Sequence, residues 1–286
     1  MLHRETVLEV NSRWTAMGRR VARKRDKTDR LDASAVAAYV RREGSNLPTV
    51  SAEDETAALD MLSNERDAAV GEATRVRNRL HALLLTIDPA YGKSYGRLKS
   101  RAVLVRLETM SPATESLLDV ERSGMVHRLV QRLRRLEDEA DELAERIREL
   151  AAPRFLPLTR LCGINLLTAG MLAGILGPGQ RFATDAQLAA YAGVSPLEAS
   201  SASRVRHRLN RGGNRRLNAL FYRIALTQAH YSTEARAYLA RRVSEGKTKR
   251  EAIRALKRHL VRVVWKLWKE CGDTSGAGGL LVQANA

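Results

Sequence analysis

Cysteine is scarce in this chain: the two cysteines, Cys162 and Cys271, lie far apart and have no Cys or His neighbour at metal-ligand spacing. This spacing excludes a cysteine-based zinc site and a disulfide framework. Long apolar runs are missing as well, since no segment approaches the ~18 consecutive apolar residues of a membrane-spanning helix. No secretory signal opens the chain. Together these absences predict a protein of a reducing cytoplasm that does not enter a membrane.

Acidic residues are few relative to basic ones, with 32 Asp and Glu against 49 Lys and Arg, a net charge of +17 and an isoelectric point near 10.6. Such an excess favours a polyanionic partner, because basic side chains that neutralise phosphates release the counterions condensed on a nucleic acid. Arginine outnumbers lysine, and its planar guanidinium can bind two phosphate oxygens at once. The composition therefore predicts binding to DNA or structured RNA.

The N-terminal segment combines one short strand with one helix. Alternating side chains over residues 6–10 predict the strand, and a strongly basic loop follows it. Thr28 can cap a helix whose first turn holds Asp29 and Asp32, where acidic side chains suit the positive end of the helix dipole. We expect this helix to end at Gly44.

Two long helices follow, over residues 54–87 and 115–150. In both, apolar residues recur at steps of three and four, as an amphipathic helix or a coiled-coil seam requires. The segment DPAYGKSYG interrupts the pattern, so we expect an antiparallel hairpin joined by a loop and serving as a scaffold or a dimer contact. The seam residues are Leu62, Ala69, Ala73, Val76, Leu80, Leu83 and Ile87 in the first helix, and Leu129, Leu133, Leu136, Ala140, Leu143, Ile147 and Leu150 in the second.

Two prolines in AAPRFLP, residues 151–157, predict the end of the second helix and the clearest domain boundary. Beyond it lie an apolar turn, a Ser- and Arg-rich loop and basic helices in which the spacing of Trp265 and Trp268 favours core packing. The chain as a whole is predicted to be mainly α. The expected domains are an N-terminal segment (1–50), a helical hairpin (51–152), a C-terminal domain (153–272) and a Gly-rich tail (273–286).

Asp29 and Asp32 form the first candidate site, because a spacing of three residues puts both carboxylates on one face of a helix. Mg²⁺ takes one or two protein carboxylates and completes its shell with water and phosphate oxygens. An ordinary helix start has the same appearance, since acids there stabilise the first turn without binding metal. From these residues alone, metal ligation and capping both stay open.

A cluster of serines and arginines forms the second candidate site. Hydroxyl and guanidinium groups both bond phosphate oxygens, which would make the cluster a phosphate-binding loop. A serine beside several cations can also act as a nucleophile, since the cations stabilise the alkoxide and the charge that develops on phosphorus. Both interpretations stay open. The residues are Ser200, Ser201, Ser203, Arg204, Arg206, His207, Arg208, Arg211, Arg215 and Arg216.

The turn LCGIN, residues 161–165, is a third candidate site. An apolar–Gly–apolar turn between two helices can present backbone N–H groups to a phosphate, with Gly163 at its centre. A plain helix–helix corner accounts equally for these residues.

Taken in order, these motifs resemble the DEDD-type insertion-sequence transposases, the "IS one-ten" family of DNA recombinases, over about residues 7–270. KTDRLDA, residues 27–33, is similar to that family's Lys-x-Asp-x-x-Asp-Ala signature. The C-terminal transposase domain of the family resembles LTRLCGINLLTAGMLAGILG, FATDAQLAAYAGVSP and RVRHRLNRGGNRRLNALF. The middle block is similar to its connecting coiled coil.

The resemblance implies a RuvC-like (RNase H-like) remnant, a long antiparallel coiled-coil hairpin and a helical C-terminal transposase domain with a helix-hairpin-helix-like start. It implies that Asp29 and Asp32 are Mg²⁺ ligands and that Ser201, preceded by Ser200, joins DNA. The implied partners are DNA, a structured guide RNA and further copies of the chain in a dimer or tetramer, in a bacterial cytoplasm and at the nucleoid. The predicted nucleic-acid-binding residues are Lys27, Gly163, Arg204, Arg206, Arg208, Arg211, Arg215 and Arg216.

The sequence departs from the family pattern in two places. The family's first Asp and its Glu lie on strands upstream of the segment that begins here, so we expect an N-terminally truncated chain with half of the acidic tetrad, which would hold metal poorly. Ala202 stands where the family has the Gly of Ser-Ser-Gly, and alanine resists backbone angles that glycine permits. Two functions follow from this pattern: a DNA transposase, or a catalytically inactive remnant that binds nucleic acid.

Overall fold

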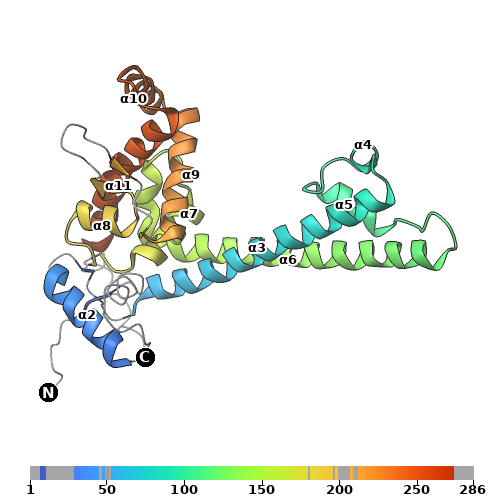
Figure 1. The fold of residues 1–286 in the computed structure, drawn as a ribbon, viewed down its shortest axis with the longest axis horizontal. Helices are drawn as coiled ribbons and strands as arrows, with labels where there is room; N and C mark the ends of the chain where they lie inside the picture. The colour runs from blue at the N-terminus through green and yellow to red at the C-terminus, as the bar shows by residue number, and fades with distance from the viewer. Residues whose placement is uncertain are drawn as a thin grey trace, which may run out of the picture. The chain divides into compact units, whose positions relative to one another are not determined.

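A computed structural model describes residues 7–10, 29–44, 47–48, 50, 53–179, 181–195, 197–198, 207–208 and 212–273. Within these residues the protein is mainly α-helical (Figure 1), as predicted. The chain divides into two compact units: unit 1 holds residues 1–59 and 150–286, and unit 2 holds residues 60–149. No helix of the described residues is both long enough and apolar enough to cross a membrane.

Unit 2 is built on two long helices, α3 (Glu55–Ile87) and α6 (Leu117–Phe155), which run side by side in opposite directions (Figure 1). Every residue of the predicted seam that falls in this unit is buried or half-buried, which confirms the periodicity read from the sequence. The core holds Ala73, Val76, Leu80 and Leu84 from α3 and Val126, Leu129, Val130 and Leu133 from α6.

The connection between α3 and α6 differs from the predicted loop. It contains two further helices, α4 (Tyr91–Tyr95) and α5 (Arg101–Glu108). Leu104 and Leu107 of α5 are completely buried in the same core as the long helices. A helix as short as α5 is marginal in water and forms because tertiary packing covers its apolar face. The sequence pattern of one short helix is too brief to predict that packing.

The second long helix also ends later than predicted. α6 passes through Pro153 to Phe155, and a 3₁₀ helix, η2 (Leu156–Arg160), continues the chain. Pro153 lies in the last turn of α6, where the helix loses the hydrogen bond that an N–H at this position would donate to the Glu149 carbonyl. Phe155 and Leu158 are almost fully buried. Their burial offsets the proline and holds the last turn in helical form.

Unit 1 places one helix, α11 (Lys249–Asp273), against η2, α8 (Asp185–Tyr191), α9 (Arg215–Tyr231) and α10 (Thr233–Ser244). The apolar helix α7 (Leu166–Leu176) packs against α9 and η2. Trp268 is 1% exposed and lies beside Phe182, with ring centroids 5.9 Å apart. The core packing predicted for Trp268 is therefore confirmed.

The N-terminal segment of unit 1 contains α2 (Asp29–Glu43), which ends immediately before Gly44 as predicted. The residues described from the predicted strand pair with the segment that follows α2. The Glu9 N–H donates to the Pro48 carbonyl and the Val50 N–H donates to the Val7 carbonyl, each over 2.9 Å. Thr6, the first residue of the predicted strand, lies outside the described residues.

Candidate functional site

Asp29 and Asp32 lie in the first turn of α2, one helical turn apart. The Asp29 residue is exposed and Asp32 is half-buried. Arg41 and Arg42 lie in the last turn, so charges at both ends of α2 complement the helix dipole. This arrangement explains why the helix begins where it does, and it leaves the Asp29 carboxylate accessible from outside.

Two carboxylates at this spacing fit a single Mg²⁺ whose shell is completed by water and phosphate oxygens. A site for two metal ions needs further carboxylates from neighbouring segments. In the part of the chain that the structure describes, no group of three or more His, Cys, Asp or Glu is placed to hold a metal ion. A role of Asp29 and Asp32 as metal ligands therefore stays a prediction, and the predicted neighbour Lys27 lies outside the described residues.

The serine and arginine cluster belongs to a segment that contains two short strands, β1 (Leu197–Glu198) and β2 (His207–Arg208). The strands pair antiparallel, with Leu197 opposite Arg208. We call residues 194–212 the serine hairpin, because Ser200 and Ser201 lie between the two strands in the sequence. Of the residues predicted for this cluster, six lie outside the described residues: Ser200, Ser201, Ser203, Arg204, Arg206 and Arg211.

The two ends of the serine hairpin meet at a close contact between glycines, which we call the neck (residues 191–193 and 213–214). A Cβ atom on Gly213 would lie 2.1 Å from the Gly193 nitrogen, a distance that no side chain can occupy. The Asn214 N–H donates to the Tyr191 carbonyl over 2.7 Å and closes the neck. The RGGN motif therefore has a structural reason, since only glycine fits at position 213.

Helix α9 begins directly after the neck and carries two of the predicted nucleic-acid-binding residues. The Asn214 side chain caps the helix by accepting from the Leu217 N–H over 3.0 Å. Arg215 is exposed and Arg216 is half-buried in the first turn. Cations are unfavourable at the positive end of a helix dipole, so this first turn concentrates positive charge that suits an anion.

Asn218 contacts the neck and Lys257 contacts Asn218, and neither residue was among the predicted site residues. The Asn218 Nδ2 atom donates to the Ala192 carbonyl over 2.8 Å and to the Gly193 carbonyl over 3.3 Å. The Lys257 ammonium donates to Asn218 Oδ1 over 2.7 Å. Lys257 is only 6% exposed. The sequence contained a signal for the burial of Lys257, because residues 257, 261, 264 and 268 of α11 follow the steps of four and three that are typical of a buried seam.

Gly163 has a backbone φ of +91° and lies against α9. A Cβ atom there would approach both the Ile224 carbonyl oxygen and the Thr227 Cβ atom to 3.2 Å. The Gln228 side chain donates to the Cys162 carbonyl over 3.0 Å and fixes the same turn. Close packing between helices therefore accounts for the glycine, and a role of Gly163 in binding nucleic acid stays a prediction.

Arg181 links residues 7–10 to the C-terminal helices and lies beside the neck. Its guanidinium forms an ion pair with Glu9 and donates to the Ile175 carbonyl over 2.7 Å and to the Tyr191 hydroxyl over 3.2 Å. The guanidinium carbon also lies 5.0 Å from the centroid of the Tyr191 ring. Since Tyr191 is part of the neck, one buried arginine connects the N-terminal segment with the base of the serine hairpin.

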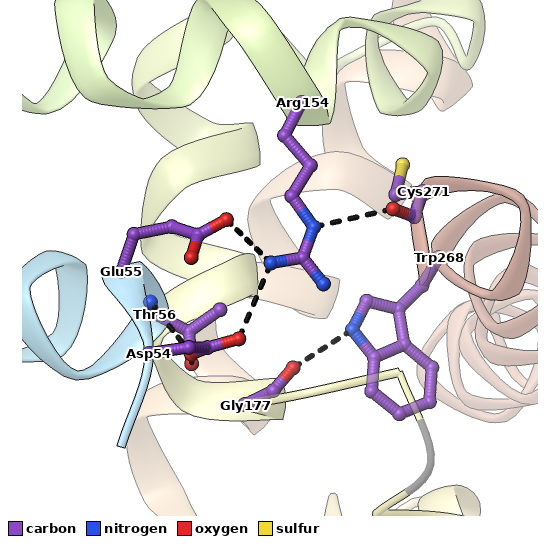
Figure 2. Close-up of polar contacts among 7 residues, drawn as sticks. All are labelled: Asp54, Glu55, Thr56, Arg154, Gly177, Trp268 and Cys271. Carbon is purple, nitrogen blue, oxygen red and sulfur yellow. Dashed lines mark hydrogen bonds and ion pairs between the residues drawn. The ribbon is translucent and has the colours of Figure 1, made fainter. Parts of the chain in front are cut away.

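Arg154 makes a second connection of this kind, at the end of α6 (Figure 2). Its Nε atom donates to the Cys271 carbonyl over 3.2 Å, and Nη1 contacts Asp54 Oδ2 over 3.2 Å and the Glu55 carboxylate. Nearby, the Trp268 Nε1 atom donates to the Gly177 carbonyl over 3.1 Å. Three remote segments of unit 1 therefore meet at one guanidinium.

Two family models match the chain, one after the other. A model described as transposase, for the DEDD domain of IS110 elements, matches residues 3–89. A second model, described as Transposase IS116/IS110/IS902 family, matches residues 157–240. The chain belongs to the IS110/IS116/IS902 family of transposases. Asp29 and Asp32 lie in the first match, and Gly163 and the serine hairpin lie in the second, so the family named by resemblance is confirmed.

Curated relatives agree with this assignment. The chain is 28% identical over 287 residues to the insertion element IS110 uncharacterized 43.6 kDa protein of Streptomyces coelicolor, an alignment that covers 85% of this chain and 71% of the relative. It is 24% identical over 288 residues to the insertion element IS116 uncharacterized 44.8 kDa protein of Streptomyces clavuligerus, with the same two coverages. The transposase for insertion sequence element IS1328 of Yersinia enterocolitica is 30% identical over 190 residues, or 62% of this chain and 51% of that protein.

This IS110-family transposase therefore has the function of an insertion-sequence transposase, which implies binding to DNA. The DEDD domain of the family implies the use of a divalent metal ion.

Proposed function

We propose that this transposase catalyses DNA strand exchange for an insertion sequence, using a RuvC-like metal site together with a serine and taking its target from a structured guide RNA. The order of the two family matches supports this most strongly, because the first contains Asp29 and Asp32 and the second contains Ser201. The residues of α2 and the serine hairpin both belong to unit 1, where Arg181 joins residues 7–10 to the helices beside the hairpin.

In this proposal the parts of the fold have separate tasks. The segment that carries α2 is part of a RuvC-like domain, and α3 and α6 form an antiparallel coiled-coil hairpin between it and the C-terminal domain. The turn at Gly163 starts that C-terminal domain as a helix-hairpin-helix-like corner. Two or four copies of the chain assemble, so that carboxylates and serine from different copies can act on the same DNA.

Asp29 and Asp32 would hold Mg²⁺, which when bound polarises a phosphate and lowers the pKa of a water molecule. The Ser201 hydroxyl loses its proton and forms an ester bond to phosphorus, while the deoxyribose oxygen of the cut strand leaves with a proton. A second strand's hydroxyl then displaces the serine oxygen, and the new phosphodiester forms. Cations of the serine hairpin and of the first turn of α9 neutralise charge on the phosphates throughout.

A strand-transfer assay with element-end DNA, guide RNA and Mg²⁺ tests the proposal. Ser201→Ala should abolish the product, whereas Ser200→Ala should retain it. Asp29→Asn and Asp32→Asn should lower the rate, whereas Asp141→Asn, at an exposed position of α6, should not. Product formed by Ser201→Ala would overturn the serine assignment. Nucleic-acid binding by the wild type without any strand transfer would favour the inactive nucleic-acid-binding function instead.

Salt dependence tests the electrostatic part of the proposal. The affinity for DNA or guide RNA should fall by an order of magnitude or more between about 50 and 200 mM salt, because several phosphates are neutralised on binding. A filter-binding titration at both salt concentrations measures this change. Affinity that stayed constant would contradict binding through the arginines of the serine hairpin.

A further inference from the structure

Lys257 lies at a core position of α11, and packing alone does not explain why a lysine stands there. It lies on the same helix face as Val261, Val264 and Trp268, which are all fully or almost fully buried. The Lys257 residue itself is 6% exposed. A leucine or methionine would fill this space without taking an ammonium group out of water, which is costly.

The Lys257 ammonium has a polar partner but no counterion among the described residues. It donates to Asn218 Oδ1 over 2.7 Å and lies 5.9 Å from the centroid of the Tyr222 ring. No carboxylate of the described residues forms an ion pair with it. Burial, and secondarily the nearby Arg254, lower the pKa of Lys257. The charge is therefore kept at an energetic disadvantage, which points to a task other than stabilising the helix.

The hydrogen bond from Lys257 holds the Asn218 amide in the orientation that the two carbonyls of the neck require. An asparagine amide has one accepting oxygen and one donating nitrogen, and the ammonium can only donate. With the Asn218 oxygen held by Lys257, the nitrogen must face the Ala192 and Gly193 carbonyls, to which it donates over 2.8 and 3.3 Å. Lys257 therefore acts on the neck through Asn218.

The neck joins the two ends of the serine hairpin to the described helices of unit 1. Its two sides are in backbone contact at Gly193 and Gly213, and the Asn214 N–H bonds the Tyr191 carbonyl. The Asn218 side chain stabilises the 192–193 side of this contact through its hydrogen bonds to the two carbonyls. The geometry of the neck matters for the serines that lie between its two sides in the sequence, because reacting groups displaced by about 1 Å can lose about a hundredfold in rate.

We propose that Lys257 is a positioning residue for strand exchange, which orients the Asn218 amide and thereby fixes the neck of the hairpin that carries Ser200 and Ser201. The inference rests on the proposed function of the serine. It does not require Lys257 to touch DNA.

The full-length chain with the variants Lys257→Met and Lys257→Arg tests the proposal, and Lys266→Met on the exposed side of α11 is the matched control. In Lys257→Met, hydrogen exchange of the Asn214 amide should accelerate about tenfold, the loss of roughly one hydrogen bond. Exchange in the core of α11 should stay as in the wild type. The single-turnover strand-transfer rate should fall about tenfold or more, while the dissociation constant for DNA stays nearly constant. Lys257→Arg should restore both properties in part, and Lys266→Met should change neither.

Asn218→Asp gives a second test that keeps Lys257 and supplies it with a carboxylate. This variant loses the donor to the Ala192 and Gly193 carbonyls, so exchange at Asn214 should again accelerate although the lysine is now paired. If Lys257→Met fails to fold, Asn218→Asp still tests whether the Asn218 amide fixes the neck. Unchanged exchange at the neck in either folded variant would overturn the proposal. An inactive wild type would overturn the proposed function alone, since the exchange measurements still decide whether Lys257 and Asn218 fix the neck.

Discussion

In unit 2 the core between α3 and α6 is apolar and the ion pairs that join these helices lie at its edge, whereas unit 1 has charged side chains at a greater depth where remote segments meet. In unit 2, the side chains of the Arg77–Glu137 pair are 22% and 33% exposed, and those of the Arg101–Asp138 pair are 73% and 51% exposed. In unit 1, the Arg181 side chain is only 15% exposed and that of Arg154 only 16%. The two units are therefore stabilised by different kinds of contact.

The comparison shows why the two units should respond differently to substitution. A seam of apolar side chains loses stability in proportion to the area and volume removed at each position. A buried charge depends on a few individual contacts, and removing one partner leaves the other desolvated and unsatisfied. Unit 1 should therefore be sensitive at single polar positions, and unit 2 at its apolar seam.

The largest effect is expected for Gly213→Ala in unit 1. The new Cβ atom would lie 2.1 Å from the Gly193 nitrogen, so backbone must move on one side of the neck. We expect the free energy of unfolding to fall by about 3 kcal/mol or more, as for severe overpacking. Chemical denaturation measures the change. Gly92→Ala in unit 2 is the control, because a Cβ there meets no atom within 4 Å. Equal stability of the two variants would contradict the backbone contact at the neck.

The next largest loss in the free energy of unfolding is expected for Leu133→Ala in unit 2. Leu133 is 0% exposed in the core shared by α3, α5 and α6. Its truncation should lower the free energy of unfolding by about 3 kcal/mol, because apolar contacts are lost and a cavity remains. Leu117→Ala on the same helix should change it by less than about 0.5 kcal/mol, since the Leu117 side chain is 80% exposed. A similar loss for both leucines would show that the seam is not the main source of stability.

Arg154→Met should lower the free energy of unfolding by an intermediate amount. It leaves Asp54, Glu55 and the Cys271 carbonyl without their common partner, at a position where the arginine side chain is 16% exposed. We expect a loss of about 2 kcal/mol, somewhat below that for breaking a fully buried pair. Arg148→Met, at an exposed i, i+3 pair with Glu145, should cost about 0.5 kcal/mol or less. Thermal unfolding of both variants measures the difference, and equal costs would show that burial of Arg154 contributes nothing.

The smallest effect is a pH dependence at Asp185 in unit 1. Hydrogen bonds from Arg258, and further contacts with Arg262, lower the pKa of the Asp185 carboxyl below its usual value of 3.8. Its contribution to stability is therefore present above pH 3.8 and is lost as the pH falls through the lowered pKa. The difference in melting temperature between wild type and Asp185→Asn should stay nearly constant from pH 6 to about 4 and should shrink as the pH falls below 3.8. A constant difference would show that the ion pairs of Asp185 contribute nothing.

Much of the helical framework could be predicted from the sequence. The steps of three and four identified α3 and α6 and their buried residues, and the signals around Asp29 and Gly44 identified the two ends of α2. Local patterns suffice there because each helix repeats the same signal over many turns. Helix α5 and the extension of α6 past Pro153 were missed, since both depend on burial against other segments.

The candidate site was predicted less completely, for a related reason. The Asp pair, the serine hairpin and the RGGN motif are contiguous in the sequence, so their residue types could be recognised. The contacts that organise them are not contiguous: Lys257 reaches Asn218, and Arg181 reaches Glu9. A lysine at a seam position of α11 was the available signal, and it was outweighed by the many exposed lysines and arginines nearby.

By itself, the sequence determined that this protein is basic, mainly helical and built around two long amphipathic helices, because charge and periodicity are local properties of the chain. The order of its motifs also determined the family. Tertiary structure alone decided that Gly213 meets Gly193, that Arg154 joins three remote segments and that a buried ammonium holds the Asn218 amide. Those contacts depend on which segments meet in space, and the energy of a buried charge is set by the neighbours that folding brings to it.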